Sequence, residues 1–332
     1  MKLAPLAVVL CGAFAARGDA RPADFAVPAA QRTELVGAVL EHLRQYYVFP
    51  ERLASAEPRL RARWESDDFR KLDRAYAIAD RINDDLRDVF HDGHLNLHLA
   101  GPLPPQFFDD PDNPDPKTVA EGEELDRRVH YGVGKVEVFP DGIGYLEMKG
   151  FAAKSPGQEK AYAAAMTQLA DSRALVIDLR ANGGGDGDSV ADLVGYFLDK
   201  KTLLQWDVER SGKRREHFSA EKVDGPRYGE KRPVYVLTSN RTFSAAEECA
   251  YDLQTQKRAT IVGEHTGGGA NHNRFFRVAK DFALSVPYMT TKNAVTGKNW
   301  EGTGVLPDVP VPAADALTTA QRLAKEKLAA GG

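Results

Sequence analysis

The sequence has 332 residues, of which 42% are hydrophobic and 28% are charged, a composition typical of a globular protein with one large domain or two ordinary ones. The formal net charge is −4 and the sequence has no long basic run, so it lacks the positive charge typical of a DNA- or RNA-binding protein. We therefore expect a globular protein with no nucleic-acid partner.

The amino terminus is typical of an exported protein. A lysine precedes the mostly apolar run Leu3–Ala16, and Ala13-Phe14-Ala15 offers a small-residue cleavage site. We expect a signal peptide over residues 1–20 and a periplasmic or secreted mature protein. The apolar run is too short to span a bilayer, so no integral membrane segment is expected after its removal. Cys11 raises the alternative of a lipid anchor, but a large leucine precedes it where such sites carry a small residue.

Residues 25–100 are expected to form a small N-terminal helical domain. Apolar residues recur at helical spacing in two stretches, Leu35–Leu43 and Leu72–Leu86. The segment Gly101–Asp115 gathers prolines and acids, which indicates an irregular connection. A second domain is expected over residues 116–330.

Beyond this connection, strand and helix patterns alternate and predict an α/β fold with a mixed sheet. A hairpin is indicated by two β-rich stretches on either side of Pro140-Asp141-Gly142. The expected strands are residues 130–138, 143–148, 174–179, 203–209, 214–218, 233–237, 259–262, 273–278 and 282–287. The expected helices are residues 154–170, 188–198, 245–256 and 313–329.

Ser244 is the most informative residue because it lies where the strand Pro233–Leu237 gives way to the helix Ala245–Gln256. A serine at a helix amino terminus is commonly an N-cap. A nucleophilic serine needs in addition a base, a residue that orients the base, and donors for an oxyanion. The chain offers candidates for all three partners.

A glycine run, Gly183-Gly184-Gly185, follows the predicted buried strand Leu175–Arg180. Consecutive glycines let backbone N–H groups turn toward a ligand, so the amides of Gly184 and Ala245 are candidate oxyanion donors. A phosphate loop is the alternative interpretation. The run lacks both the Gly-Lys-Ser/Thr ending and the spacing of a dinucleotide-binding motif.

The residues alone leave more than one histidine open as the base. His94 follows Asp92-Gly93 at the junction between the helical unit and an alternation of leucines, and clefts form at such junctions. His265 is closer to the serine in sequence, and His272 follows it in the same glycine-rich loop. Glu301, between a tryptophan and glycines, is the candidate orienting carboxylate, with an exposed loop acid as the alternative.

Four segments together resemble the tail-specific, C-terminal-processing serine peptidase family, which also contains the tricorn protease core and the repeats of interphotoreceptor retinoid-binding protein. These segments are Leu175–Gly185, Leu237–Glu247, Gly263–Gly267 and Glu301–Asp308, in the family's order. The resemblance covers the chain from about Asp92 to its end. It implies a mixed-sheet, crotonase-like (ClpP/crotonase-type) peptidase core with a small N-terminal helical domain.

The resemblance implies a peptidase that cleaves a peptide or protein substrate through an acyl-enzyme, with Ser244 as the nucleophile. Processing proteases of the family take a lysine from the segment after the nucleophile as their base, whereas this chain has Gly268-Gly269-Ala270 in that place. The tricorn-like branch uses an upstream histidine and a downstream glutamate, and His94 and Glu301 match these positions. The implied triad is therefore Ser244, His94 and Glu301, with Gly184 and Ala245 as the oxyanion donors.

Two departures from the family pattern limit what is carried over. The tricorn arrangement has a serine immediately before its histidine, whereas this chain has Gly93, so no four-member relay is expected. The segment Gly101–Arg128 is too short and too rich in proline for a PDZ-like insertion. The chemistry requires no metal and no organic cofactor. Cys249 is the only cysteine after signal removal, which excludes an intramolecular disulfide and a cysteine zinc site.

Two other functions stay open at this point. The retinoid-binding branch indicates that the fold can carry apolar ligands, and fold does not fix function. In a carrier, the pocket would be lined by Phe107, Phe108, Phe151 and Tyr288. An esterase would use the same triad on a non-peptide ester. The sequence indicates no oligomeric state.

Overall fold

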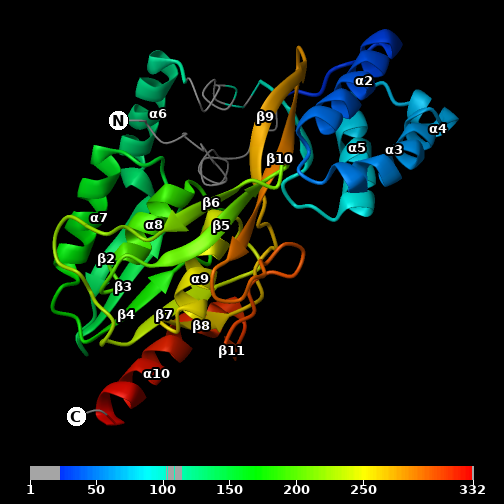
Figure 1. The fold of residues 1–332 in the computed structure, drawn as a ribbon. Coiled ribbons are helices and arrows are strands. Elements are labelled where there is room, and N and C mark those ends of the chain that lie inside the picture. Colours follow the sequence, from blue (N-terminus) through cyan, green and yellow to red (C-terminus); the bar gives the residue numbers. More distant parts are fainter. Residues whose placement is uncertain (1–22, 102, 104–107, 109–113, 331–332) are drawn as a thin grey trace.

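The computed structural model describes residues 23–101, 103, 108 and 114–330, and Figure 1 shows its fold. The expected signal peptide and Phe107 lie outside these residues. The described chain begins with helices, as predicted; there are four of them, and each presents apolar side chains to a common core. They are α2 (Ala29–Tyr46), α3 (Pro50–Trp64), α4 (Asp67–Arg70) and α5 (Ala75–Phe90). No helix among the described residues has both the length and the apolarity needed to cross a membrane.

A six-stranded sheet forms the centre of the rest of the chain. Its strand order is β11-β8-β7-β4-β3-β2, and every neighbouring pair is parallel except β2 with β3, so the predicted mixed sheet is confirmed. The two central strands, β4 and β7, are buried along their whole length because both faces are covered. The strands are β2 (Val133–Val138), β3 (Ile143–Met148), β4 (Ala174–Asp178), β7 (Val234–Thr238), β8 (Thr260–Gly263) and β11 (Val309–Pro310).

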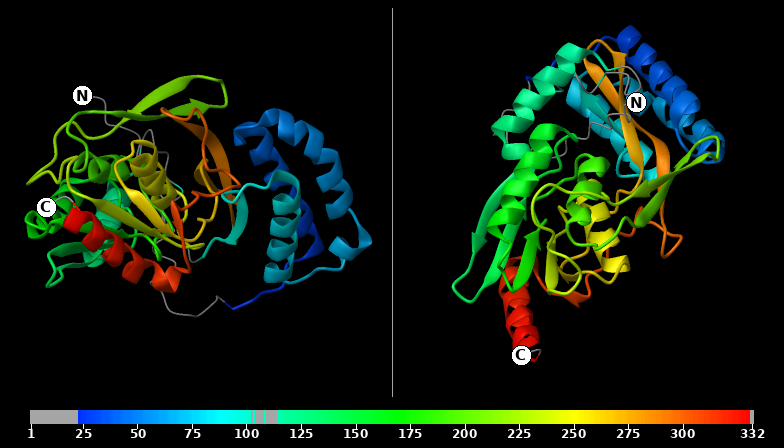
Figure 2. Two further views of the ribbon diagram at one scale, coloured as in Figure 1. Left: turned by 90° about the horizontal axis from the view of Figure 1, so that it is seen from below. Right: turned by 60° about the vertical axis from the view of Figure 1, so that its left-hand side comes forward.

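Helices cover both faces of this sheet, as the two views of Figure 2 and the labels of Figure 1 show. Leu175 and Ile177 of β4 pack on one face against α7 (Pro156–Gln168), α8 (Gly187–Gly195) and α9 (Ala245–Thr255). The alternating residues Ala174 and Val176 pack on the other face against α10 (Ala316–Ala330). The period of two along each strand therefore divides the core into two layers.

A second, antiparallel sheet joins this core to the helices. Its strand order is β1-β10-β5-β6, and β9 pairs with β10 as well. The first part of β10 pairs with β1 and β9, and its last part pairs with β5. Strand β9 lies on the side of α2 in Figure 1. The strands are β1 (Asn96–Leu99), β5 (Leu203–Glu209), β6 (Arg214–Phe218), β9 (His272–Ala279) and β10 (Phe282–Asn293).

The long strand β10 is what holds the residues just before β1 against the core. Asn96 is paired with Ser285, and the Ser285 hydroxyl donates to the carbonyl oxygen of His94 at 2.6 Å. Val286 and Leu284 of the same strand complete the core of α2–α5. The helices therefore share their apolar core with this sheet, and the division of the chain at residues 100 and 116 stays a prediction.

Five segments differ from the predicted elements. Helix α6 (Pro116–Arg128) was not predicted, and it buries none of its residues. The segment of β1 showed an alternation of leucines, but no strand was predicted there. Strand β10 extends six residues beyond its predicted end at Pro287. Two short 3-10 helices, η2 (His130–Gly132) and η3 (Ala313–Asp315), occupy the predicted starts of a strand and of the last helix.

Candidate active site

Ser244 lies at a sharp turn between β7 and α9. Its backbone has φ 56° and ψ −124°, a conformation that costs a non-glycine residue about 1–3 kcal/mol. Neighbouring bonds hold the turn: the Thr242 hydroxyl donates to the carbonyl of Leu179 at 2.9 Å, and the Phe243 amide donates to the carbonyl of Asn182 at 3.1 Å. Such a turn presents the serine hydroxyl just beyond the carboxyl-terminal end of β7.

Glu247, one turn into α9, ties the serine to the loop that follows β8. Its buried carboxylate accepts four hydrogen bonds, from the amides of Ser244, Gly268 and Gly269 at 2.8, 2.7 and 2.8 Å and from the hydroxyl of Thr266. Burial raises the pKa of Glu247 to about 7, and the hydrogen bonds act in the opposite direction. The Glu247 side chain thus holds in place both the strained backbone of Ser244 and the loop beside it.

We expect Glu247→Gln to lower the free energy of unfolding by about 2 kcal/mol or more, because the new NH₂ group faces N–H donors and leaves them unsatisfied. The rate of any reaction at Ser244 should fall as well, since the turn loses its support. Chemical denaturation gives the stability change. The matched control is Glu326→Gln, an exposed acid on α10 paired with Arg322, which should change stability by less than about 0.5 kcal/mol. A Glu247→Gln protein as stable as this control would contradict the role assigned to Glu247.

His94 lies beside the serine, with its Nε2 atom 3.0 Å from the Ser244 Oγ atom. Its side chain is 5% exposed, and its ring packs on the ring of Phe243 with the centroids 4.7 Å apart. The Asp92 carboxylate accepts its backbone N–H at 3.1 Å, which fixes the turn after α5. Burial, and after it His272, lowers the pKa of His94 to about 3, so the imidazole is neutral at pH 7 and Nε2 can accept a proton.

Two glycines leave the space that these side chains fill. A Cβ atom on Gly269 would lie 2.3 Å from the Phe243 ring and 2.8 Å from Cε1 of His94. A Cβ atom on Gly184 would lie 2.8 Å from Cβ of Ser244, and its φ of 115° is one that side chains rarely adopt. The glycine-rich character of both loops therefore has a steric cause at the site.

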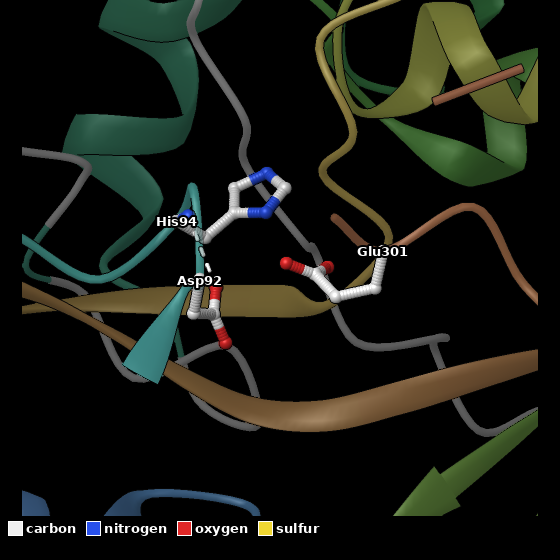
Figure 3. Close-up of side chains that lie close together, drawn as sticks. All are labelled: Asp92, His94 and Glu301. Carbon is white, nitrogen blue, oxygen red and sulfur yellow. Dashed lines mark hydrogen bonds between the residues drawn. The ribbon is translucent and has the colours of Figure 1, made fainter. Parts of the chain in front are cut away.

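Glu301 lies on the other side of His94 and is held by the backbone. Its Oε2 atom accepts the amides of Ala270 and Asn271 at 2.6 and 3.1 Å. Within the part of the chain that the structure describes, its Oε1 atom and the Nδ1 atom of His94 are buried without a hydrogen-bond partner. A ring nitrogen of His94 and carboxylate oxygens of Asp92 and Glu301 lie within 4.8 Å of one another (Figure 3).

The two carboxyl groups beside His94 affect each other. Burial, and after it the charge of Asp92, raises the pKa of Glu301, and burial raises the pKa of Asp92. The structure thus brings Ser244, His94 and Glu301 together but forms only the first of the two hydrogen bonds of a triad. The ring nitrogen and the Glu301 oxygen lie within 4.8 Å of each other, so the second bond needs a closer approach, and catalytic hydrogen bonds are often long before substrate binds.

The two predicted oxyanion donors differ in their present partners. The Ala245 amide, at the first position of α9, has no backbone or side-chain acceptor among the described residues. The Gly184 amide donates to the Asn182 Oδ1 atom at 2.9 Å. A substrate oxygen would therefore meet a free amide at Ala245, whereas at Gly184 it would have to share or replace the bond to Asn182.

The other predicted candidates lie elsewhere. His265 is exposed, and the Nε2 atom of His272 lies 3.3 Å from the Asp207 Oδ1 atom. Phe151 is buried in the core of the six-stranded sheet, whereas Phe108 packs in a separate cluster with Ala283. Phe151 and Phe108, two of the aromatic residues proposed for a carrier pocket, thus belong to different clusters.

A cavity of about 380 Å³ at the carboxyl ends of β3, β4, β7 and β8 has a mostly polar lining that includes none of these aromatic residues. Acidic and basic side chains face it together, among them Glu147, Arg180 and Arg241. It does not have the apolar wall that a retinoid-like ligand needs.

Sequence reasoning assigned no role to Asp92, Asn182, Glu247 or Asn271. Glu247 could have been found, because a glutamate three residues after a serine at the N-cap of a helix has the spacing of a capping box. Asp92 could have been found as an acid two residues before His94, where its side chain can accept the His94 amide. Nothing in the sequence indicated Asn182 or Asn271. Asn182 accepts the Gly184 amide because of how their shared loop folds, and Asn271 donates to the distant Asp92.

Comparison with known proteins identifies the family of this chain. The sequence pattern that defines Peptidase family S41 matches residues 142–311, which is 170 of the 332 residues. The match includes Gly184, Ser244 and Glu301, whereas His94 precedes it. The chain belongs to Peptidase family S41.

Among its relatives is the carboxyl-terminal-processing protease of Synechocystis sp., 32% identical over 146 residues, which are 43% of this chain and 32% of the relative. The chain spans about a third of the length of the curated relatives it matches. The fold is shared with a protein of Parabacteroides merdae, with a TM-score of 0.63, 18% identity, and 88% and 96% of the two chains covered. It is also shared with the photosystem II D1 C-terminal processing protease, with a TM-score of 0.51, 16% identity, and 85% and 93% covered.

Proposed function

We propose that this protein is a serine peptidase that hydrolyses peptide bonds through an acyl-enzyme. The observation that carries the proposal is the 3.0 Å contact between the Ser244 Oγ atom and the His94 Nε2 atom, at a strained turn in front of α9. A cap needs neither a buried neutral imidazole nor a left-handed backbone at the serine. Membership of family S41 supports the same chemistry.

Acylation begins when the Ser244 oxygen attacks the carbonyl carbon of the scissile bond and its proton passes to Nε2 of His94. The Ala245 amide, joined by that of Gly184, stabilises the oxyanion of the tetrahedral intermediate. The C–N bond then breaks, and Nε2 gives the proton to the leaving amine. Glu301 stabilises the charged imidazole across its Nδ1–H, which requires the closer approach described above.

Deacylation repeats these steps with water in place of the serine. Nε2 of His94 removes a proton from water, the oxygen attacks the ester carbon, and the bond to Ser244 breaks as the serine recovers its proton. The substrate is a peptide or protein, and the curated relatives are by name carboxyl-terminal-processing proteases. The signal-like amino terminus favours action in the periplasm or outside the cell.

Peptide cleavage separates this function from its two rivals. Incubation of the protein with a defined mixture of synthetic peptides, followed by mass spectrometry, should reveal new carboxyl termini, and none should form with Ser244→Ala. Hydrolysis of p-nitrophenyl esters without any peptide cleavage would overturn the proposal in favour of an esterase. Tight binding of a fluorescent long-chain fatty acid with no hydrolysis would overturn it in favour of a carrier.

A further inference from the structure

The side of the His94 imidazole that faces away from Ser244 is enclosed by two carboxyl groups. One ligand atom each of Asp92, His94 and Glu301 lies within 4.8 Å of the other two. Figure 3 shows the three side chains converging, with Nδ1 on the ring edge that faces the Glu301 carboxylate. His94 is 95% buried, and Nδ1 has no partner in the described residues.

Each of the three side chains is anchored through atoms other than those left open. The Nε2 atom of His94 is hydrogen-bonded to the Ser244 hydroxyl. The Oε2 atom of Glu301 accepts hydrogen bonds from the amides of Ala270 and Asn271. Nδ1 and Oε1 stay unpartnered between them. Metal ligands in proteins show this pattern, because outer hydrogen bonds orient each ligand while its lone pair faces the ion.

Asp92 completes the set with both of its oxygen atoms already oriented. Oδ1 accepts the amide of His94 at 3.1 Å, and Oδ2 accepts the Asn271 side chain at 2.9 Å. A carboxylate oxygen has two lone pairs, so either atom can accept one hydrogen bond and still bind a cation. Two acids held together beside an imidazole repel each other, and a divalent cation between them removes that repulsion.

We propose that Asp92, His94 and Glu301 form an inhibitory binding site for Zn²⁺. Zinc binds imidazole nitrogen and carboxylate oxygen at about 2.0–2.2 Å in a tetrahedron, which sets neighbouring ligand atoms about 3.3–3.5 Å apart. The side chains have to approach by about 1.5 Å at most from their present spacing. Calcium and magnesium prefer all-oxygen sites, so the imidazole favours zinc over these two ions.

Zinc at this site blocks the base and leaves the fold unchanged. A neutral imidazole has one lone pair, and a cation bound at Nδ1 takes it, so the ring proton resides on Nε2. Nε2 then donates to the Ser244 oxygen and cannot accept the serine proton. The inhibition rests on the proposed function of Ser244, whereas the binding of zinc does not.

Calorimetric titration of the wild-type protein with zinc chloride tests the site without any need for activity. We expect one ion per chain, with an affinity that falls at least about tenfold when Asp92→Asn or Glu301→Gln is added. His265→Gln in the same background is the matched control and should bind as tightly, because His265 is exposed. Thermal melting checks that each variant is folded. No binding, or binding that Asp92→Asn and Glu301→Gln leave unchanged, would overturn the proposal.

A second readout tests the inhibition. Labelling of the wild-type serine by a fluorophosphonate should slow at least tenfold in zinc and recover with EDTA, whereas labelling of Asp92→Asn should respond far less to zinc. Zinc-independent labelling of the wild type would contradict the inhibitory role. A wild type that takes no label even with EDTA would contradict the proposed function, and calorimetry would still decide the zinc site.

Discussion

Ser244→Ala should lower kcat/KM for a cleaved peptide by about 10⁴–10⁶, the largest effect expected from any single substitution. Without the hydroxyl no acyl-enzyme forms, and only positioning and the oxyanion donors remain to speed direct attack by water. The removed atom makes its described hydrogen bond to His94, so the folded structure should persist. Peptide hydrolysis followed by chromatography measures the change.

The matched control for this variant is Ser211→Ala, an exposed serine in the turn between β5 and β6. It should retain full activity. Substrate binding to Ser244→Ala should also stay near the wild-type level, because the hydroxyl contributes to the transition state more than to binding. A Ser244→Ala protein with more than about a tenth of wild-type activity would identify Ser244 as a cap and not a nucleophile.

His94→Gln should lower kcat/KM by about 10³–10⁴, since general-base catalysis contributes about 10²–10⁴ and the nucleophile depends on it. Glutamine retains a polar end near the serine but cannot take its proton. Because burial keeps His94 neutral at pH 7, the wild-type ring is ready to accept that proton. Steady-state hydrolysis at pH 7 gives the ratio of the two rates.

His265→Gln provides the comparison, because sequence reasoning left that histidine open and the structure has it exposed. Its activity should equal that of the wild type. His94 is buried, so unfolding must be measured for His94→Gln to separate loss of the base from loss of the fold. An inactive His265→Gln protein together with an active, folded His94→Gln protein would contradict the assignment of His94 as the base.

Many of the strands could be predicted because their signals are local. The strands Leu203–Glu209 and Arg214–Phe218 begin and end where the alternation and the intervening Ser-Gly turn indicate. Helix α6 was missed because none of its residues is buried, so no apolar face marks it. Strand β1 was missed because it is only four residues long and depends on pairing with β10.

The sequence indicated candidate residues for the site but not their geometry. Motif order pointed to Ser244 and His94, whose side chains prove to lie in contact. The bond between Gly184 and Asn182 was not foreseeable, since it depends on how the loop after β4 folds over itself. The distance between the Glu301 carboxylate and the His94 ring could not be predicted either, because Glu301 is held by the backbone amides of Ala270 and Asn271 in another loop.

The rate of fluorophosphonate labelling, followed by intact-mass and peptide mass spectrometry in the presence of EDTA, tests most directly whether His94 activates Ser244. We predict one adduct per chain, located on Ser244, with a rate that falls at least a hundredfold in His94→Gln and stays unchanged in His265→Gln. Equal labelling rates in the wild type and a folded His94→Gln protein would contradict the pairing of these two residues.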